Sequence, residues 1–300
     1  MRYKNLILFV LLSIAWGSAF NAIKIGLNYF PPVLFASLRY ILAGAIMITY
    51  ATLVTQRILP KNYNEFLQIL VAGFFMITVY HTLLFIGELR VESGIASIIV
   101  SMSPVLTTGF ARVILPKERL DKVGLIGLGV GFLGILLLLS PSSGDIFSID
   151  LFRIMILLAA ASFAIGSVLT RFLDSDLEIE AMEAWSMIIG ALFMLVISYS
   201  INEPLLSINI SINALLALSY LALFSSSIGF LIYFNLLQDL GPIEVNLVSY
   251  SAPIVATIIG ILFLDEEIRI ISGIALLMIF LGFFLLKRDQ IKREIEKISL

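Results

Sequence analysis

The chain of 300 residues contains no cysteine, a single histidine and few charges, which make up 13 % of its residues. The absence of cysteine excludes disulfides, thiolate metal sites and cysteine nucleophiles. A soluble domain carries about 25 % charged residues, so this chain has too few to coat a surface in water. Because 60 % of the residues are hydrophobic and the mean hydropathy is +1.07, we expect a polytopic membrane protein.

The sequence also lacks the short motifs of common catalytic and nucleotide sites. It contains no Walker loop, no HExxH motif and no cluster of histidine with carboxylates. The net charge of −2 and the absence of a basic stripe give no sign of nucleic-acid binding. We therefore predict that the protein is not an enzyme and uses no cofactor or metal.

Long apolar runs are abundant. A helix needs about 20 apolar residues to cross the hydrocarbon core of a bilayer. Ten runs qualify, at about 5–26, 33–55, 66–87, 94–115, 122–140, 151–172, 181–200, 213–236, 243–264 and 268–287. The first run is too long for a signal-peptide core and lacks a cleavage site, so we expect it to remain as the first span.

Lysine and arginine are distributed unequally between the two sides of these spans. One side carries Arg2, Lys4, Arg57, Lys61, Lys117, Arg119, Lys122, Arg171 and the basic tail Lys287, Arg288, Lys292, Arg293 and Lys297. The other side carries only Arg90 and Arg269. Cytoplasmic loops are enriched in basic residues, so we predict a protein of the cell membrane with both termini in the cytoplasm.

The two halves of the chain repeat each other. Three pairs of residues are separated by 149 positions: Pro104 and Pro253, Glu118 and Glu267, and Gly124 and Gly273. We divide the chain into two five-span domains, 1–145 and 146–300. Because five is odd, the second copy enters the membrane from the opposite side, and inverted repeats of this kind are typical of secondary transporters.

Several motifs also resemble a known family. They are Trp16-Gly17-Ser18-Ala19-Phe20-Asn21, Pro31-Pro32, Phe35 to Tyr40, Ala96 to Pro104, Pro116 to Leu120, and Leu264 to Glu267. Their order, spacing and duplication resemble the EamA-type carriers of the drug/metabolite transporter superfamily. The resemblance implies an all-α integral membrane protein with ten transmembrane helices in two inverted five-helix EamA repeats around a central cavity. It also implies transport of small organic solutes, often outward. The chain departs from the family pattern at Phe163 and Glu88.

Two cations inside or near the spans are candidate ligands for an anionic group of a substrate. A cation in hydrocarbon costs about 2.5–3.5 kcal/mol on insertion scales, so such residues face protein or water. Arg39 lies deeper than Lys24, and its planar fork can hold a carboxylate by two bonds. The alternatives are that Lys24 reaches the interface and that Arg39 braces helix ends through carbonyl oxygens.

His81, next to Tyr80, is a natural proton carrier because histidine titrates near neutral pH. Glu88 lies two helical turns further along the same face, so the pair His81 and Glu88 is a candidate for proton coupling. The alternatives are a hydrogen-bonded helix contact for His81 and, for Glu88, an interfacial charge paired with Arg90 or Lys24.

Pro104 and Pro253 should kink or loosen their helices, since proline lacks a backbone donor and clashes with the preceding turn. We assign them to gating. The facing polar residues form a candidate cavity wall: Ser97 and Ser101 in the fourth span, and Asn246 and Tyr250 in the ninth.

Aromatic and amide side chains complete the candidate binding residues. Trp16 and Tyr80 can stack on a flat solute, and Asn21 can hydrogen-bond a polar one. Glycines recur along one face of the fifth span, at Gly124, Gly127, Gly131 and Gly134. We expect this face to pack within a monomer; a homodimer interface is the alternative.

The sequence thus favours a secondary transporter that exports amino acids or related zwitterionic or aromatic solutes. A phosphorylated substrate would require more buried cations than Lys24 and Arg39. A cationic drug would require a deep carboxylate, for which Glu88 is the nearest candidate. Export of drugs, nucleosides or phosphorylated metabolites is the alternative. A membrane-embedded scaffold or enzyme is a distant one, since it would need catalytic groups clustered at one depth.

Overall fold

The computed structural model describes residues 2–114, 122–139, 150–173, 175–204, 210–240, 245, 247–267 and 269–298. Within these ranges every regular element is helical and no strand occurs. The predicted site residue Asn246 and the predicted loop residues Lys117 and Glu118 lie outside them. The fold class predicted from the sequence is confirmed.

Each half of the chain contributes five spans. The first half consists of α1 (Arg2–Gly26), α2 (Pro32–Val54), a third span built from α3 (Tyr63–Val71), η1 (Ala72–Val79) and α4 (Tyr80–Gly87), a fourth built from α5 (Ser93–Val100) and α6 (Ser103–Ile114), and α7 (Lys122–Leu139). The second half consists of α8 (Leu151–Leu173), α9 (Ile179–Ser200), an eighth span built from α10 (Ile212–Ser219), η3 (Tyr220–Ile228) and α11 (Gly229–Leu240), then α13 (Val248–Phe263) and α14 (Ile270–Ile298).

The helices have the length and composition of membrane spans. In the described part of the chain, seven are long and apolar enough to cross a bilayer, and three more are shorter and apolar, at Val123–Leu139, Val248–Phe263 and Ile270–Leu286. Large apolar side chains such as Val113, Phe263 and Ile270 are more than three-quarters exposed, as expected of residues that face lipid.

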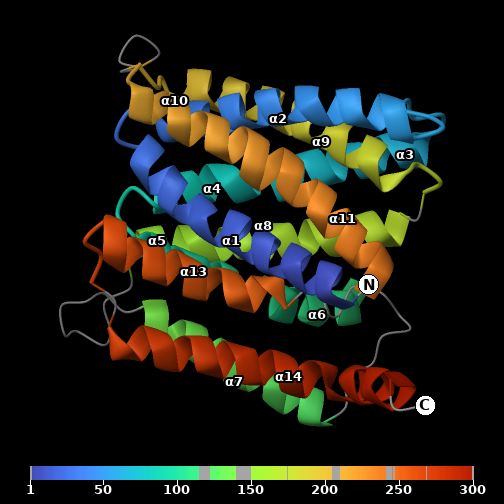
Figure 1. The fold of residues 1–300 in the computed structure, drawn as a ribbon, viewed down its shortest axis with the longest axis vertical. Coiled ribbons are helices and arrows are strands. Elements are labelled where there is room, and N and C mark those ends of the chain that lie inside the picture. The colour runs from blue at the N-terminus through green and yellow to red at the C-terminus, as the bar shows by residue number, and fades with distance from the viewer. Residues whose placement is uncertain are drawn as a thin grey trace.

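The helices pack with the two-fold pattern expected of a repeat. The second spans of the two halves, α2 and α9, pack on each other, and so do the fifth spans, α7 and α14. The first span of each half packs on the fourth span of the other, α1 on α13 and α8 on α5 and α6. Figure 1 shows α7 and α14 side by side at one edge of the bundle.

Both chain termini lie at one end of the bundle, on the right in Figure 1. We call this the terminal end and the opposite one the far end. Because consecutive spans are antiparallel, α2 and α5 begin at the far end, whereas α3 and α9 begin at the terminal end.

The far end is joined by carboxylates that cross between the repeats. Glu203 accepts hydrogen bonds from the backbone N–H groups of Val33 (2.9 Å) and Leu34 (2.8 Å) at the start of α2. Glu266 accepts from the N–H groups of Ser93 (2.7 Å) and Gly94 (3.2 Å) at the start of α5. Free N–H groups at a helix N-terminus favour an anion, so these contacts stabilise the far end. Glu266 thus binds the start of α5, although it lies just before α14 in the sequence.

The two intramembrane prolines have different surroundings. Pro104 lies in the first turn of α6, directly after a break at Ser101 and Met102, where its missing N–H costs little. The hydroxyl of Ser103 donates to the carbonyl of Val100 (2.7 Å). Pro253 lies inside the uninterrupted helix α13. Within the described residues the fourth span is therefore broken beside its proline, whereas α13 continues past Pro253 without a break.

The glycine face of α7 packs within the chain, as predicted. A Cβ atom added at Gly127 would lie 2.6 Å from the carbonyl oxygen of Gly282 in α14, and one added at Gly282 would lie 2.6 Å from that of Gly127. The two backbones therefore approach too closely for any side chain, which is how small residues stabilise membrane helix pairs.

Candidate functional site

Arg39 is the deepest cation of the candidate set and is 5 % exposed. Its Nε atom donates to the hydroxyl of Ser226 (2.9 Å) and its Nη2 atom to that of Ser225 (3.2 Å), both in η3. Its guanidinium carbon lies 5.0 Å from the ring centroid of Tyr40. Arg39 thus binds side-chain hydroxyls rather than the helix-end carbonyls of the alternative, and two of its five N–H donors serve these bonds.

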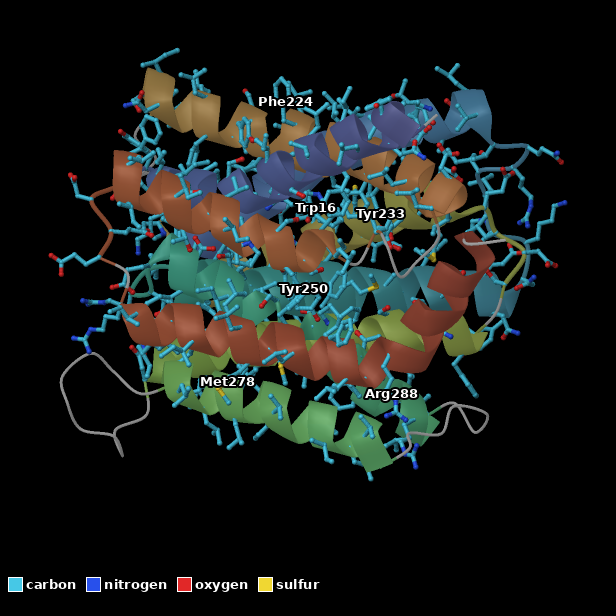
Figure 2. All side chains as sticks on the ribbon, turned by 60° about the horizontal axis from the view of Figure 1, so that its bottom comes forward. Trp16, Phe224, Tyr233, Tyr250, Met278 and Arg288 are labelled. Atoms are coloured by element: carbon cyan, nitrogen blue, oxygen red, sulfur yellow. The ribbon has the colours of Figure 1, made fainter. Side chains whose placement is uncertain are left out.

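Trp16 binds Ser225, one of the two serines that bind Arg39. The indole Nε1 of Trp16 donates to the backbone carbonyl of Ser225 (3.2 Å). Its ring stacks on Tyr233 with centroids 5.5 Å apart and meets Phe230 edge-on at 5.9 Å. Figure 2 shows Trp16 and Tyr233 side by side in the middle of the molecule. The structure therefore brings together Trp16 and Arg39, which the sequence analysis predicted separately.

His81 is held by both ring nitrogens. Its Nε2 lies 2.7 Å from the hydroxyl of Tyr40 and its Nδ1 lies 3.0 Å from the carbonyl oxygen of Ile77. Because a carbonyl oxygen only accepts, Nδ1 carries the hydrogen and the Tyr40 hydroxyl donates to Nε2. Tyr80 packs its ring on His81 (4.5 Å) and on Phe163 (5.4 Å).

These contacts form one connected group from four spans, which we call the central polar cluster. Its members are Trp16, Arg39, Tyr40, Tyr80, His81, Ser225, Ser226 and Tyr233. It offers a cation, hydroxyl groups and aromatic faces in one place. Such a set can bind a carboxylate and stack on an apolar or aromatic group of the same solute.

Wide π-helical turns lie next to the cluster in both repeats. Tyr80 and His81 directly follow η1, and Ser225 and Ser226 lie within η3. In each π segment a hydroxyl donates to the carbonyl five residues earlier, Thr78 to Gly73 and Ser227 to Ala222, both at 2.9 Å. π turns are rare and recur at functional sites. Sequence reasoning missed them, although Thr78 and Ser227 are separated by the repeat distance of 149.

Lys24 and Glu88 lie at the far end, outside the central polar cluster. The ammonium group of Lys24 donates to the backbone carbonyls of Glu88 (2.7 Å) and Val91 (2.9 Å). Both carboxylate oxygens of Glu88 are buried, with no hydrogen-bond partner in the described ranges. The expected pairing of Glu88 with Arg90 or Lys24 is therefore wrong. His81 and Glu88 also share no direct hydrogen bond, so their proton coupling stays a prediction.

Asn21, Ser97 and Ser101 belong to contacts near the far end or within one helix. The amide nitrogen of Asn21 donates to the hydroxyl of Ser93 (2.7 Å) and to the carbonyl of Ala256 (3.1 Å), which joins α1, α5 and α13. Ser97 and Ser101 donate to carbonyl oxygens of their own helix. The structure does not bring these three residues to the central polar cluster.

Tyr250 is 6 % exposed and packs against α14, with its ring centroid 5.4 Å from that of Phe280 and 5.0 Å from that of Phe283. Its buried hydroxyl has no hydrogen-bond partner in the part of the chain that the structure describes. Figure 2 places Tyr250 beyond Trp16 and Tyr233, toward α14. Its predicted partner Asn246 lies outside the described residues.

Glu183 is a buried carboxylate that sequence reasoning missed. It lies in α9, one turn from the terminal end, and is 7 % exposed. Glu88, which is 0 % exposed, is therefore not the one buried carboxylate within the spans. The sequence does contain a sign of it, because Glu183 lies within the predicted span 181–200 and an acidic residue inside a membrane span is itself an indication of function.

The sequence pattern of one family, described as the EamA-like transporter family, matches this chain twice, over residues 4–140 and 152–288. The described residues contain no group of three or more His, Cys, Asp or Glu side chains that could hold a metal ion.

Similar proteins are found in bacteria, archaea and plants. An "Uncharacterized transporter" of Archaeoglobus fulgidus is 26 % identical over 281 residues, which is 92 % of this chain and 95 % of the relative. The "Uncharacterized inner membrane transporter YedA" of Escherichia coli K12 is 29 % identical over 282 residues, 92 % of this chain and 89 % of the relative. The "WAT1-related protein At3g02690, chloroplastic" of Arabidopsis thaliana is 30 % identical over 84 % of this chain and 61 % of the relative.

A solved crystal structure has the same fold. It superposes with a TM-score of 0.65 at 20 % sequence identity and covers 99 % of this chain and 100 % of the solved chain.

Proposed function

The chain belongs to the EamA-like transporter family, and from that premise we propose that it exports amino acids or related zwitterionic or aromatic solutes by alternating access. It is a multi-pass membrane transporter, as its relatives are. The substrate class, the direction of transport and the roles of single residues are our proposal. We place both termini in the cytoplasm and treat 1–145 and 146–300 as the two moving repeats.

The observation that carries this proposal is the arrangement around Arg39. Its guanidinium lies against Tyr40 and bonds two serines of the opposite repeat. Arginine holds a carboxylate by two parallel bonds when its fork is held in place. The rings of Trp16 and Tyr233 lie next to the same serines and supply an apolar surface. A solute with one carboxylate and an apolar or aromatic part fits both features.

The same arrangement argues against a phosphorylated substrate. Arg39 is the one cation of the central polar cluster, and Lys24 is bound to backbone carbonyls at the far end. A phosphate carries about two negative charges at neutral pH, so it would need more cations to offset its desolvation.

Alternating access requires helices that change shape between two states. We assign this to the fourth and ninth spans, where Pro104 follows a helix break and Pro253 lies inside the helix. The break at Ser101 and Met102 interrupts the fourth span, and Pro253 weakens the local hydrogen bonding of α13, so both spans bend more easily than an unbroken helix.

The test is counterflow in proteoliposomes preloaded with single amino acids, with L-phenylalanine as the first probe. We expect the wild type to exchange labelled for unlabelled phenylalanine. Arg39→Ala should lose this exchange while keeping the elution volume of the folded protein. Failure of every amino acid to exchange would overturn the substrate class. Undiminished exchange in Arg39→Ala would show that Arg39 has a structural role and does not bind the substrate.

A further inference from the structure

Glu183 differs from most other acidic residues that contact the protein interior. Glu65 is paired with Arg57 and accepts a hydrogen bond from the backbone of Lys61. Glu203 and Glu266 each accept from N–H groups at a helix start, and Glu178 accepts from the N–H of Gln56. These carboxylates therefore have structural partners that stabilise their charge. Glu88 has no hydrogen-bond partner either, but it lies at the far end beside a cation, since the ammonium group of Lys24 donates to its backbone carbonyl (2.7 Å).

No hydrogen bond or ion pair reaches the carboxylate of Glu183 from the described part of the chain. Its neighbours in sequence are the buried apolar residues Met182 and Ala184. Burying an uncompensated charge is costly, whereas a neutral carboxylic acid in the same place costs far less. A position that stabilises no helix end and holds no cation requires another reason for an acid.

The groups that face Glu183 leave it without a counter-charge. α9 packs on α2, η1 and α3. The titratable residues of α2 are Arg39, which donates to the serines of η3, Tyr40 and Tyr50. η1 carries none, and of the two on α3, Glu65 is paired with Arg57 and Tyr63 is 74 % exposed. A proton is therefore the cation that can neutralise Glu183 without any other group moving.

Tyr40 of the central polar cluster lies on α2, the helix on which α9 packs. Its hydroxyl donates to Nε2 of His81, which lies nearer the far end. Hydroxyl and imidazole groups pass protons along hydrogen bonds. Tyr40 and His81 therefore offer a hydrogen-bonded path for a proton within the cluster.

We propose that Glu183 is the proton-binding carboxylate that couples transport to a proton gradient. This inference rests on the proposed carrier function. In one state the carboxylate takes up a proton from one side of the membrane, and in the other state it releases the proton to the opposite side while the solute moves the other way. The O–H bond is the one bond that forms and breaks. Glu183 acts by gaining and losing charge and does not hold the solute.

The first test does not depend on the substrate. Infrared difference spectra of the purified full-length protein, titrated with pH, report the carbonyl stretch of a protonated carboxyl group. We expect a titrating band of a carboxyl group in apolar surroundings that is lost in Glu183→Gln and shifted in Glu183→Asp. Glu180→Gln, one turn earlier on α9 and less buried, is the matched control and keeps the band. Because Glu88 is also buried without a hydrogen-bond partner, the spectra are compared in a Glu88→Gln background, and a band that persists there unchanged in Glu183→Gln overturns the proposal.

The second test separates coupling from binding, with L-phenylalanine in proteoliposomes. Glu183→Gln should retain counterflow without a gradient and lose at least about tenfold of the accumulation driven by a pH gradient. Glu183→Asp should keep both. Loss of counterflow together with gradient-driven transport would make Glu183 a solute-binding residue and overturn the proposal. If the wild type exchanges no amino acid, the proposed substrate class fails, and the infrared result still decides the role of Glu183.

Discussion

At the scale of single residues, the buried polar groups divide into two kinds. Some tie helices together, such as Asn21 between α1, α5 and α13, and Lys24 on the carbonyls of Glu88 and Val91. Others converge on one place, as Trp16 and Arg39 do at Ser225. In a bilayer both kinds need partners, so burial alone does not identify a binding residue. Convergence from several helices is the better sign.

The two tryptophans of the chain offer a matched pair for testing this distinction. Trp16 donates its Nε1–H to Ser225 (3.2 Å), and Trp185 donates its own to the carbonyl of Ile58 (2.8 Å). Each Trp→Phe change removes one hydrogen bond, worth about 1 kcal/mol, and part of a ring. We expect Trp16→Phe to raise KM about five- to tenfold and Trp185→Phe to lower the unfolding temperature without raising KM. An equal effect of both changes on KM would contradict a binding role for Trp16.

Arg39, Trp16, Tyr80 and His81 were predictable from the sequence because their types are unusual or informative at membrane depth. The serines that hold Arg39 were not, since Ser225 and Ser226 are common residues that lie 186 and 187 positions away. Long-range partners follow from helix packing, which one sequence does not specify. Glu183 was predictable and was overlooked.

At the scale of elements, the irregular helices lie where the function is proposed. η1 and η3 occupy equivalent places in the two repeats and adjoin or contribute to the central polar cluster. The hydroxyls of Thr78 and Ser227 each satisfy a carbonyl of the widened turn. Ten spans and the repeat were predictable from apolar length and the offset of 149. The π turns were not, because the same apolar composition also suits a regular helix.

Thr78→Val and Ser227→Ala should therefore act on the site through the backbone. Each change removes a buried hydrogen bond and should lower the free energy of unfolding by about 1 kcal/mol. Because Ser225 and Ser226 lie in η3, Ser227→Ala should also raise KM several-fold. Thr49→Val removes a hydroxyl bonded to the carbonyl of Ala45 on an exposed face and should change neither quantity. Thermal unfolding and initial transport rates provide the check, and a normal KM in Ser227→Ala would argue against shape control by η3.

The contact between α7 and α14 makes a second prediction at this scale. Gly282→Ala places a methyl group 2.6 Å from the carbonyl oxygen of Gly127, whereas a Cβ atom at Gly129 on the other face of α7 meets nothing within 4 Å. Overpacking costs about 1–3 kcal/mol, so Gly282→Ala should lower the unfolding temperature, and Gly129→Ala should leave it unchanged or raise it slightly. A lower unfolding temperature for Gly129→Ala than for Gly282→Ala would show that the glycine face of α7 does not pack on α14.

At the scale of the whole molecule, the two repeats are related in both packing and contacts. Equivalent spans of the two repeats pack on each other in two places, α2 on α9 and α7 on α14. The carboxylates that cross between the repeats at the far end, Glu203 and Glu266, both come from the second repeat. The molecule is therefore symmetric in its fold and asymmetric in its far-end contacts. Composition and parity predicted the symmetry, but the crossing contacts lie in loops and depend on the assembled bundle.

The predicted orientation can be tested directly because the chain has no cysteine. Tyr63, at the terminal end, is 74 % exposed, and Ile210, at the far end, is 72 % exposed. In intact cells a membrane-impermeant maleimide should label Ile210→Cys and leave Tyr63→Cys unlabelled until the membrane is permeabilised. The reverse pattern would place both termini outside the cytoplasm, against the distribution of basic residues.

The most direct test of alternating access measures both ends of the molecule at once. Spin labels at Leu89 and Ile212 report the distance between the repeats at the far end, and labels at Val113 and Asp239 report it at the terminal end. The four residues are exposed, and no native cysteine competes for the label. We expect L-phenylalanine to shift the two distance distributions in opposite directions, one end closing as the other opens. Distances that stay fixed, or that widen together at both ends as in a channel, would contradict the account.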